Sequence, residues 1–226
     1  MKTFVYVDGY NFYYRSLKNT PHKWLDLSKF CNRLLPNNEI TRINYYTARA
    51  TPQPTNPDVG KRQWEYLRAL MTLPTIKITY GQFRAHPQNL PLFDSLLSDE
   101  LQQKKLLPSK YNFPKRVRFS TVLKTEEKGS DVNLASHLIY EAVQKKFEVA
   151  FVFSNDSDLA EPIRIVNQEL NIPVYVYVKD TLKPAHELKN VAKNVYHFRN
   201  SDLADCQFPK TFLDAKGRPI EKPLKW

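Results

Sequence analysis

The sequence predicts an α/β fold built on a mostly parallel sheet that helices cover on both faces. Short runs rich in β-branched and aromatic residues alternate with helical patterns along most of the chain, which is typical of βαβ units. The apolar runs, such as Val149–Phe153, lack strict polar alternation, as expected of strands that are buried on both sides.

The first half of the chain begins this alternation. Lys2–Val7 is a β-branched and aromatic run, and Leu25–Leu35 carries apolar residues at helical spacing. Ile40–Ala50 places apolar and polar residues at alternate positions, which predicts a strand. Val59–Met71 has a helical pattern that ends shortly before a proline, and Ile76–Phe83 is again typical of a strand.

The second half repeats the pattern. Leu134–Val143 and Leu159–Leu170 have helical spacing, and the predicted strand Val149–Phe153 lies between them. The remaining elements are a strand at Val174–Val178, a short helix at Pro184–Ala192 and a last strand at Val195–Phe198.

Two proline-containing segments interrupt this alternation. Residues 87–114 contain four prolines around a helical stretch, Leu92–Leu107, and we interpret them as an insertion at about residues 86–115, over one edge of the sheet. Residues 200–226 contain three further prolines and little periodicity. The predicted organisation is therefore one domain over residues 1–199, followed by a C-terminal tail.

The charge is unevenly distributed. The 226 residues include 34 Lys and Arg against 23 Asp and Glu, which gives a net charge of +11. Residues 101–124 hold seven of the basic residues and no acidic one, with Tyr111, Phe113 and Phe119 among them. Cations for phosphates beside rings for bases are typical of proteins that bind single-stranded nucleic acid. A solvated lysine-rich loop has the same composition and stays an alternative.

Other classes of protein fit the sequence poorly. The two cysteines, Cys31 and Cys206, form neither a disulfide framework nor a zinc motif. Met1 runs directly into a strand pattern and not into a signal peptide. The apolar runs are much shorter than a membrane span. We therefore expect a cytoplasmic protein with no membrane partner.

Acidic residues follow the strands at the places where a parallel sheet binds ligands. Asp8 comes directly after the first strand, Asp131 lies just before a helix, and Asp156 and Asp158 follow a buried strand. Since ligands bind outside the carboxyl ends of parallel strands, these carboxylates converge if the strands are neighbours. Crowded carboxylates favour a bound cation, and hard oxygen ligands select Mg²⁺ or Mn²⁺. Each Asp alone is better explained as a helix N-cap, but three such junctions together favour a metal site.

Three segments carry a family resemblance, in order along the chain: Asp8–Asn11, Lys128–Ala135 and Ser154–Leu159. They resemble the three signatures of the NYN domain family, which belongs to the PIN-like nuclease superfamily, and the likeness spans roughly residues 2–198. The resemblance implies a three-layer α/β/α sandwich with an acidic metal site at one end of the sheet. It also implies a Mg²⁺- or Mn²⁺-dependent endonuclease that cleaves RNA. In-line attack on the phosphate by a metal-activated water would leave 5′-phosphate and 3′-hydroxyl ends.

The same resemblance implies a role for each site residue. The core carboxylates would be Asp8, Asp131 and Asp156, with Asp158 as a fourth metal ligand that acts through water. The remaining site residues would be Asn11 and Ser154, which orient the metal or its water, and Lys128, which contacts the phosphate.

RNA is the expected partner. It could be single-stranded or structured, and transfer RNA is one of the candidates. The residues expected to contact RNA are Tyr10, Tyr13, Arg15, Ser154, Lys115, Arg116 and Arg118. The aromatic residues after Asp8 are equally suited to base stacking and to packing. An exposed edge strand or the tail could mediate a homo-oligomer.

His137 departs from the family pattern, because many relatives carry a further acid six residues after Asp131. With a histidine at this position, the sequence does not decide whether the site holds one metal ion or two. The histidine also favours an alternative, an RNA-binding protein that no longer hydrolyses RNA. A bacterial subgroup resembles the chain in this histidine and in a Gly-Arg-Pro…Trp tail like that at 217–226, and some of its members are labelled hydroxylases of a succinoyl-pyridine compound. An oxidoreductase is therefore a second alternative, although the five glycines form no Gly-x-Gly-x-x-Gly pattern.

Overall fold

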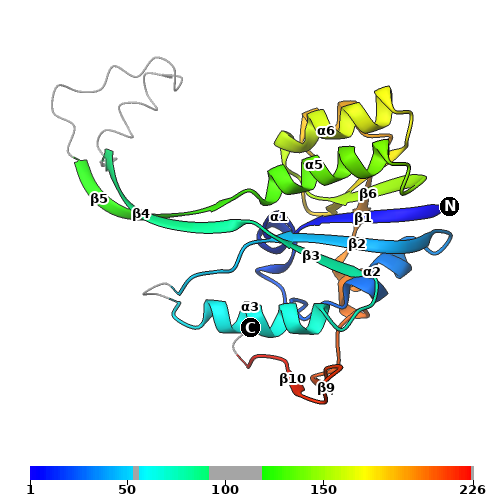
Figure 1. The fold of residues 1–226 in the computed structure, drawn as a ribbon. Helices are drawn as coiled ribbons and strands as arrows, with labels where there is room; N and C mark the ends of the chain where they lie inside the picture. The colour runs from blue at the N-terminus through cyan, green and yellow to red at the C-terminus, as the bar shows by residue number, and fades with distance from the viewer. Residues whose placement is uncertain (53–55, 92–118, 225–226) are drawn as a thin grey trace. The chain divides into compact units, whose positions relative to one another are not determined.

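The computed structural model describes residues 1–52, 56–91 and 119–224. A six-stranded sheet forms its centre, in the order β3-β2-β1-β6-β7-β8 (Figure 1). Its strands are β1 (Lys2–Asp8), β2 (Glu39–Thr47), β3 (Ile76–Tyr80), β6 (Val149–Phe153), β7 (Val174–Lys179) and β8 (Asn194–Phe198). Every pair of neighbours in this sheet is parallel, which confirms the predicted α/β class and the parallel sheet.

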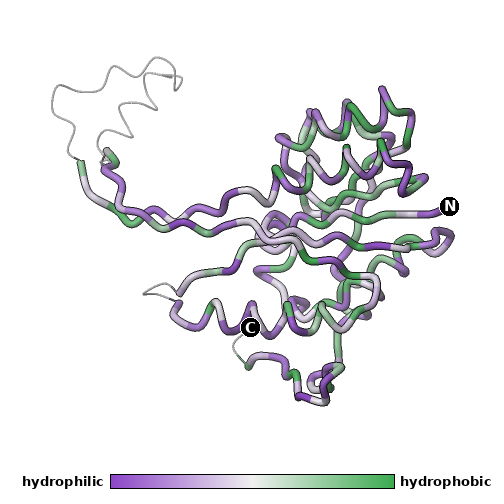
Figure 2. The backbone as a smooth tube through the Cα atoms, in the orientation of Figure 1, coloured by the Kyte–Doolittle hydropathy of each residue, from purple (hydrophilic) through white to green (hydrophobic). Residues whose placement is uncertain are grey.

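Helices cover both faces of the sheet. One face carries α5 (Ser130–Val143), α6 (Ala160–Arg164) and α7 (His186–Val191), and the other carries α2 (Leu27–Leu34) and α3 (Val59–Leu70) (Figure 1). Figure 2 shows hydrophobic and hydrophilic residues alternating along α3 and α5, as expected of helices with one face against a core. No helix of the described residues is long and apolar enough to cross a membrane.

Strand β1 divides the interior into two cores. Because successive side chains of a strand point to opposite faces, Phe4 and Tyr6 pack in the core under α5, whereas Val5 and Val7 pack in the core that contains α2 and α3. All four side chains are at most 4% exposed. Burial on both faces explains why the strand reads as a continuous apolar run.

The predicted strand Ile76–Phe83 is two strands in the structure. β3 ends at Tyr80, and a new strand, β4 (Gln82–Pro91), begins after Gly81. A Cβ at Gly81 would lie 2.6 Å from the carbonyl oxygen of Lys128, so only glycine allows the backbone to pass this close. β4 pairs with β5 (Phe119–Lys128) in a separate two-stranded sheet.

Residues 84–126 form a compact unit of their own. Within it, the Thr121 hydroxyl donates a hydrogen bond of 2.9 Å to the Asn89 side chain. The predicted helix Leu92–Leu107 lies outside the described residues, as do Lys115, Arg116 and Arg118.

The C-terminal residues pack against the main unit. They form α8 (Asn200–Ala204) and an antiparallel pair of short strands, β9 (Thr211–Leu213) and β10 (Pro219–Glu221). Ile220 is fully buried in the core on the α2 and α3 face, and the Trp24 indole N–H donates to the Pro209 carbonyl at 2.8 Å. Strands of three residues leave too little periodicity for a sequence pattern to predict.

A buried carboxylate joins α5 to the sheet, and its loss should be costly. Glu141 accepts hydrogen bonds from the Tyr6 hydroxyl at 2.8 Å and the Asn44 amide at 3.3 Å, and it is 4% exposed. Since Glu141→Ala leaves two buried donors without this partner, we expect the free energy of unfolding to fall by about 3 kcal/mol. Urea denaturation measures this, and Glu161→Ala, which removes an exposed partner of Arg164, should leave the free energy of unfolding almost unchanged. If both variants lost the same free energy of unfolding, the stabilising role of Glu141 between α5 and the sheet would be contradicted.

Candidate metal centre

Three aspartates from separate segments meet at the carboxyl end of the sheet. Asp8 ends β1, Asp131 lies in the first turn of α5, and Asp156 follows β6. One carboxylate oxygen from each lies within 4.8 Å of the others. β1 and β6 are neighbours, and the chain runs outward from them in both directions, so the three residues lie at the topological switch point of the sheet.

Hydrogen bonds fix the Asp8 carboxylate. Its Oδ1 accepts from the backbone N–H of Asn11 at 3.0 Å, and its Oδ2 accepts from the Ser154 hydroxyl at 2.9 Å. Asp8 is only 2% exposed. Two donors on a buried carboxylate set its orientation before any ligand binds.

Ser154 joins two of the three carboxylates. While its hydroxyl donates to Asp8, its oxygen accepts from the backbone N–H of Asp156 at 3.1 Å. Asp156 in turn accepts from the N–H of Asp158 at 3.0 Å and caps the short helix Ser157–Leu159. Asp8 caps α1 (Gly9–Phe12) in the same way. The capping and metal-binding interpretations therefore apply to the same side chains.

One further acidic residue, Glu127, lies near the end of β5 and was not predicted from the sequence. It accepts hydrogen bonds from both the backbone N–H and the hydroxyl of Ser130, at the start of α5. Its charge acts on both Asp8 and Asp131. Its position directly before the Lys128–Ala135 motif was the sequence signal that could have identified it.

Burial, together with the neighbouring charges, raises the pKa values of two of the carboxyl groups. Burial, followed by the charges of Asp156 and Glu127, raises the pKa of Asp8 to about 6, against the opposing effect of its two hydrogen bonds. Burial and the nearby charges of Asp8 and Glu127 raise the pKa of Asp131 to about 7. The groups are held together at an electrostatic cost that a cation would remove.

The donor set fits a hard divalent cation. Three carboxylates offer oxygen ligands of the kind that Mg²⁺ and Mn²⁺ prefer. In the described residues, the triad includes no cysteine or histidine that would favour a softer metal.

Metal binding should therefore depend on pH. Because the folded pKa values of Asp8 and Asp131 exceed the ordinary value, the free energy of unfolding of the metal-free protein should fall as pH rises from about 4 to about 7. A cation needs the ionised carboxylates, so its stabilising effect grows over that interval. A free cation concentration of about 100 times the Kd should raise the free energy of unfolding by about 2.7 kcal/mol. For a chain of this size, that corresponds to a rise of about 5 to 10 °C in Tm.

The measurement is a thermal melt with and without Mn²⁺ at pH 8 and at pH 5, with NaCl at equal ionic strength as the control. We expect the shift in Tm at pH 8 and almost none at pH 5. Equal shifts at the two pH values would show that the cation binds elsewhere.

The other residues expected in the site occupy different positions around the triad. Asn11 accepts a hydrogen bond from the backbone N–H of Asn155 at 3.0 Å, so it ties the loop after β6 to α1. Ser154, which was also expected to contact RNA, is buried. Asp158 and Lys128 are exposed. Arg15 is exposed and borders a small hollow with Asn11 and Ser154.

His137 lies on α5 but makes its contacts away from the triad. Its Nδ1 lies 3.1 Å from the Tyr46 hydroxyl. Burial and the charge of Lys77 lower the pKa of His137, which favours the neutral ring. Among the described residues, His137 is therefore a hydrogen-bonded side chain of α5 and is not grouped with the carboxylates that could hold a metal ion.

Comparisons with known proteins bear on the family and the fold of the chain. The model of the NYN domain matches residues 2–200. The chain is 27% identical, over 255 aligned positions, to a Pseudomonas putida protein named 6-hydroxy-3-succinoylpyridine 3-monooxygenase HspA, and the match covers all of this chain and 75% of that protein. A crystal structure of a Vibrio parahaemolyticus protein of unknown function has the same fold, with a TM-score of 0.50 and 18% identity over 87% of this chain and 92% of that one.

Proposed function

The chain belongs to the NYN domain family, and on that premise we propose that it is a metal-dependent endoribonuclease. One observation carries the proposal: three aspartates from three segments bring carboxylate oxygens within 4.8 Å of one another at the switch point of the sheet. Helix capping alone does not require this convergence. Clustered acids with perturbed pKa values are also typical of catalytic sites.

The residues of the site would have different roles in cleavage. Asp8, Asp131 and Asp156 would hold the cation, which when bound would activate water and polarise the scissile phosphate. Ser154 and Asn11 hold the carboxylates and the adjoining loop in place. Lys128, at the exposed end of β5, supplies positive charge for the phosphate. The products would carry 5′-phosphate and 3′-hydroxyl ends.

A cleavage assay tests the proposal. Purified protein is incubated with total RNA and Mn²⁺, with EDTA in a parallel sample, and the product ends are identified. Metal-dependent cleavage with 5′-phosphate ends is the expected result. RNA binding without cleavage would instead support the non-catalytic alternative, and NADH turnover or a bound flavin would support the oxidoreductase that the name of the Pseudomonas relative suggests.

The basic segment yields a separate prediction about RNA affinity. Lys115, Arg116 and Arg118 lie outside the described residues but belong to the most basic stretch of the sequence. Replacing all three with Ala should weaken binding and reduce the slope of log Kd against log salt by about 2, because each phosphate contact on a single strand contributes about 0.7. Fluorescence anisotropy at several salt concentrations measures this. An unchanged slope would mean that these residues only solvate the chain.

A further inference from the structure

A pocket of about 330 Å³ opens beside the candidate metal centre. Its wall comes from α1 and the π-helical turn η1 (Tyr13–Leu17), from the end of β2, and from α3. The volume is at the small end of the range for ligand sites. The described lining residues include five tyrosines and three cations but neither Asp nor Glu.

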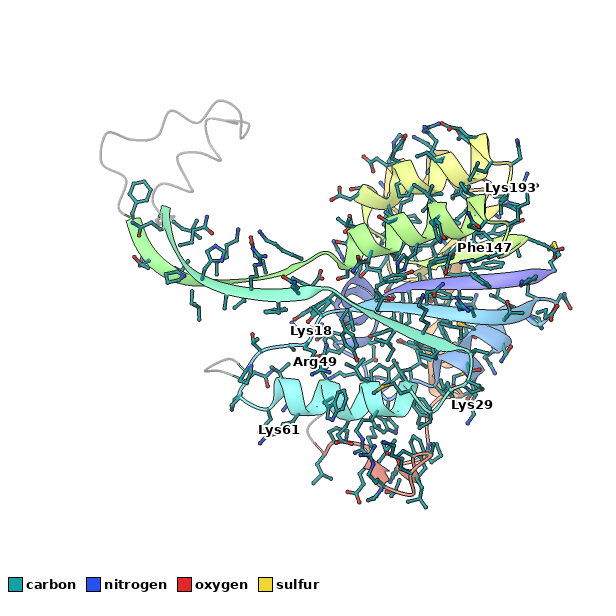
Figure 3. The ribbon with its side chains drawn as sticks, viewed as in Figure 1. Lys18, Lys29, Arg49, Lys61, Phe147 and Lys193 are labelled. Atoms are coloured by element: carbon teal, nitrogen blue, oxygen red, sulfur yellow. The ribbon has the colours of Figure 1, made fainter. Side chains whose placement is uncertain are left out.

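The cations of the pocket lack acidic partners in its lining. They are Lys18, which Figure 3 labels, Lys23 and Arg62. Burial, and then the charges of Arg62 and Lys18, lower the pKa of Lys23. The cations therefore act on one another by repulsion, which an anionic group in the pocket would relieve.

Two tyrosine rings provide a stacking surface in the pocket. Tyr10 and Tyr14 lie parallel, with 6.2 Å between ring centroids and 15° between planes. Tyr14 is 55% exposed, and the Lys18 ammonium lies 4.8 Å from its ring centroid. The π-helical turn, closed by the bond from the Lys18 N–H to the Tyr13 carbonyl, carries Tyr14 and follows directly on α1, which carries Tyr10.

The pocket and the carboxylates share a wall. Gly9 lines the pocket and directly follows Asp8. The charge of Asp8 acts on Tyr45 and that of Glu127 acts on Tyr10, and both tyrosines line the pocket. A group in the pocket would therefore lie close to a phosphate at the metal centre.

We propose that this pocket binds a nucleotide of the RNA strand next to the scissile phosphate, with its base on Tyr10 and Tyr14 and its phosphate beside Lys23 and Arg62. The inference rests on the proposed function, because it assigns the pocket to the same substrate. Stacking accepts any base. Of the three side-chain amides in the described lining, two already bind the protein: Gln63 binds the backbone of Ala48 and Ala50, and Asn56 accepts from Arg62. The third amide, that of Asn19, is exposed. The pocket should therefore bind RNA with little sequence preference.

The test measures affinity in EDTA, so it does not depend on cleavage. The probes are a labelled uridine tetranucleotide and its abasic counterpart, which keeps the backbone but lacks the bases. Wild type should bind the tetranucleotide about 10-fold more tightly than the abasic strand. Tyr14→Ala should reduce this affinity ratio toward one. Arg62→Ala should weaken the binding of both strands about equally and so keep the ratio.

Tyr140→Ala is the matched control. Tyr140 is 57% exposed and lies under the Lys146 ammonium at 5.0 Å, but it is on α5 and does not line the pocket. It should keep the wild-type ratio, and melting curves should show that all the variants fold. Equal ratios in Tyr14→Ala and Tyr140→Ala would overturn the proposal.

Two further probes identify other ligands. Tighter binding of free uridine 5′-monophosphate than of the tetranucleotide would assign the pocket to a free nucleotide, and tighter binding of nicotinate would assign it to an aromatic carboxylate; either result overturns the proposal. If wild type binds the tetranucleotide more tightly than the abasic strand but shows no metal-dependent cleavage, the RNA pocket is supported and the nuclease proposal is contradicted. If RNA is cleaved in a metal-dependent way but Tyr14→Ala does not change the affinity ratio of the two strands, the nuclease proposal is supported and the RNA pocket is contradicted.

Discussion

An Asp8→Asn variant is expected to cleave RNA at least about 1,000-fold more slowly than wild type. Such a loss corresponds to about 4 kcal/mol of transition-state stabilisation, and it follows from removing one of three charges that would hold the cation. The amide can still accept from the Asn11 N–H, so the cap should survive. Initial rates in Mn²⁺ measure the effect, and the shift in Tm on adding Mn²⁺ should disappear with the activity.

Asp26 offers a close control for this variant. Like Asp8, it is buried and has an extended backbone conformation, and it caps α2 by accepting from the Lys29 N–H at 3.0 Å, the same distance as at Asp8. Asp26→Asn therefore makes the same chemical change at an N-cap outside the triad. It should retain wild-type cleavage. If the two variants cleave equally fast, the carboxylate of Asp8 serves only as a cap.

The sequence predicted the buried strand β6 more closely than the start of α5. Val149–Phe153 was predicted with its observed bounds, because a buried apolar run needs no context to be recognised. The helix predicted to start at Leu134 begins at Ser130, because Gly129 adopts a φ of +92° and starts the helix one turn earlier. The apolar pattern shows where a helix meets the core and not where its exposed first turn begins.

A rule of parallel sheets predicts two members of the triad, whereas the third, Asp131, follows β5, which lies in the separate two-stranded sheet. Asp8 and Asp156 each follow a strand, and the rule needs only that β1 and β6 be neighbours, as they are. The tyrosine pocket could not be predicted in the same way. Its lining joins Tyr14 on η1 to Arg62 on α3, and no motif or spacing links the two segments.

Ser154→Ala is expected to lower activity by about 10- to 100-fold, the usual cost of losing a group that orients a metal ligand. Ser154 is a positioning residue, because its hydroxyl binds Asp8 at 2.9 Å and the Asp156 N–H at 3.1 Å. Without it, the Asp8 carboxylate loses one of its two donors. The Mn²⁺ concentration for half-maximal activity should rise, which a merely structural role would not cause.

Thr3→Val distinguishes this effect from the loss of any buried hydroxyl. Thr3 is fully buried near the start of β1, at the opposite end of the strand from Asp8, and its hydroxyl donates to the Met1 carbonyl at 2.9 Å. It should lower Tm without changing the Mn²⁺ dependence of cleavage. If both variants lower Tm and neither changes that dependence, Ser154 stabilises the fold without orienting Asp8. If only Ser154→Ala changes it, the hydroxyl sets the carboxylate geometry from which the affinity for the cation follows.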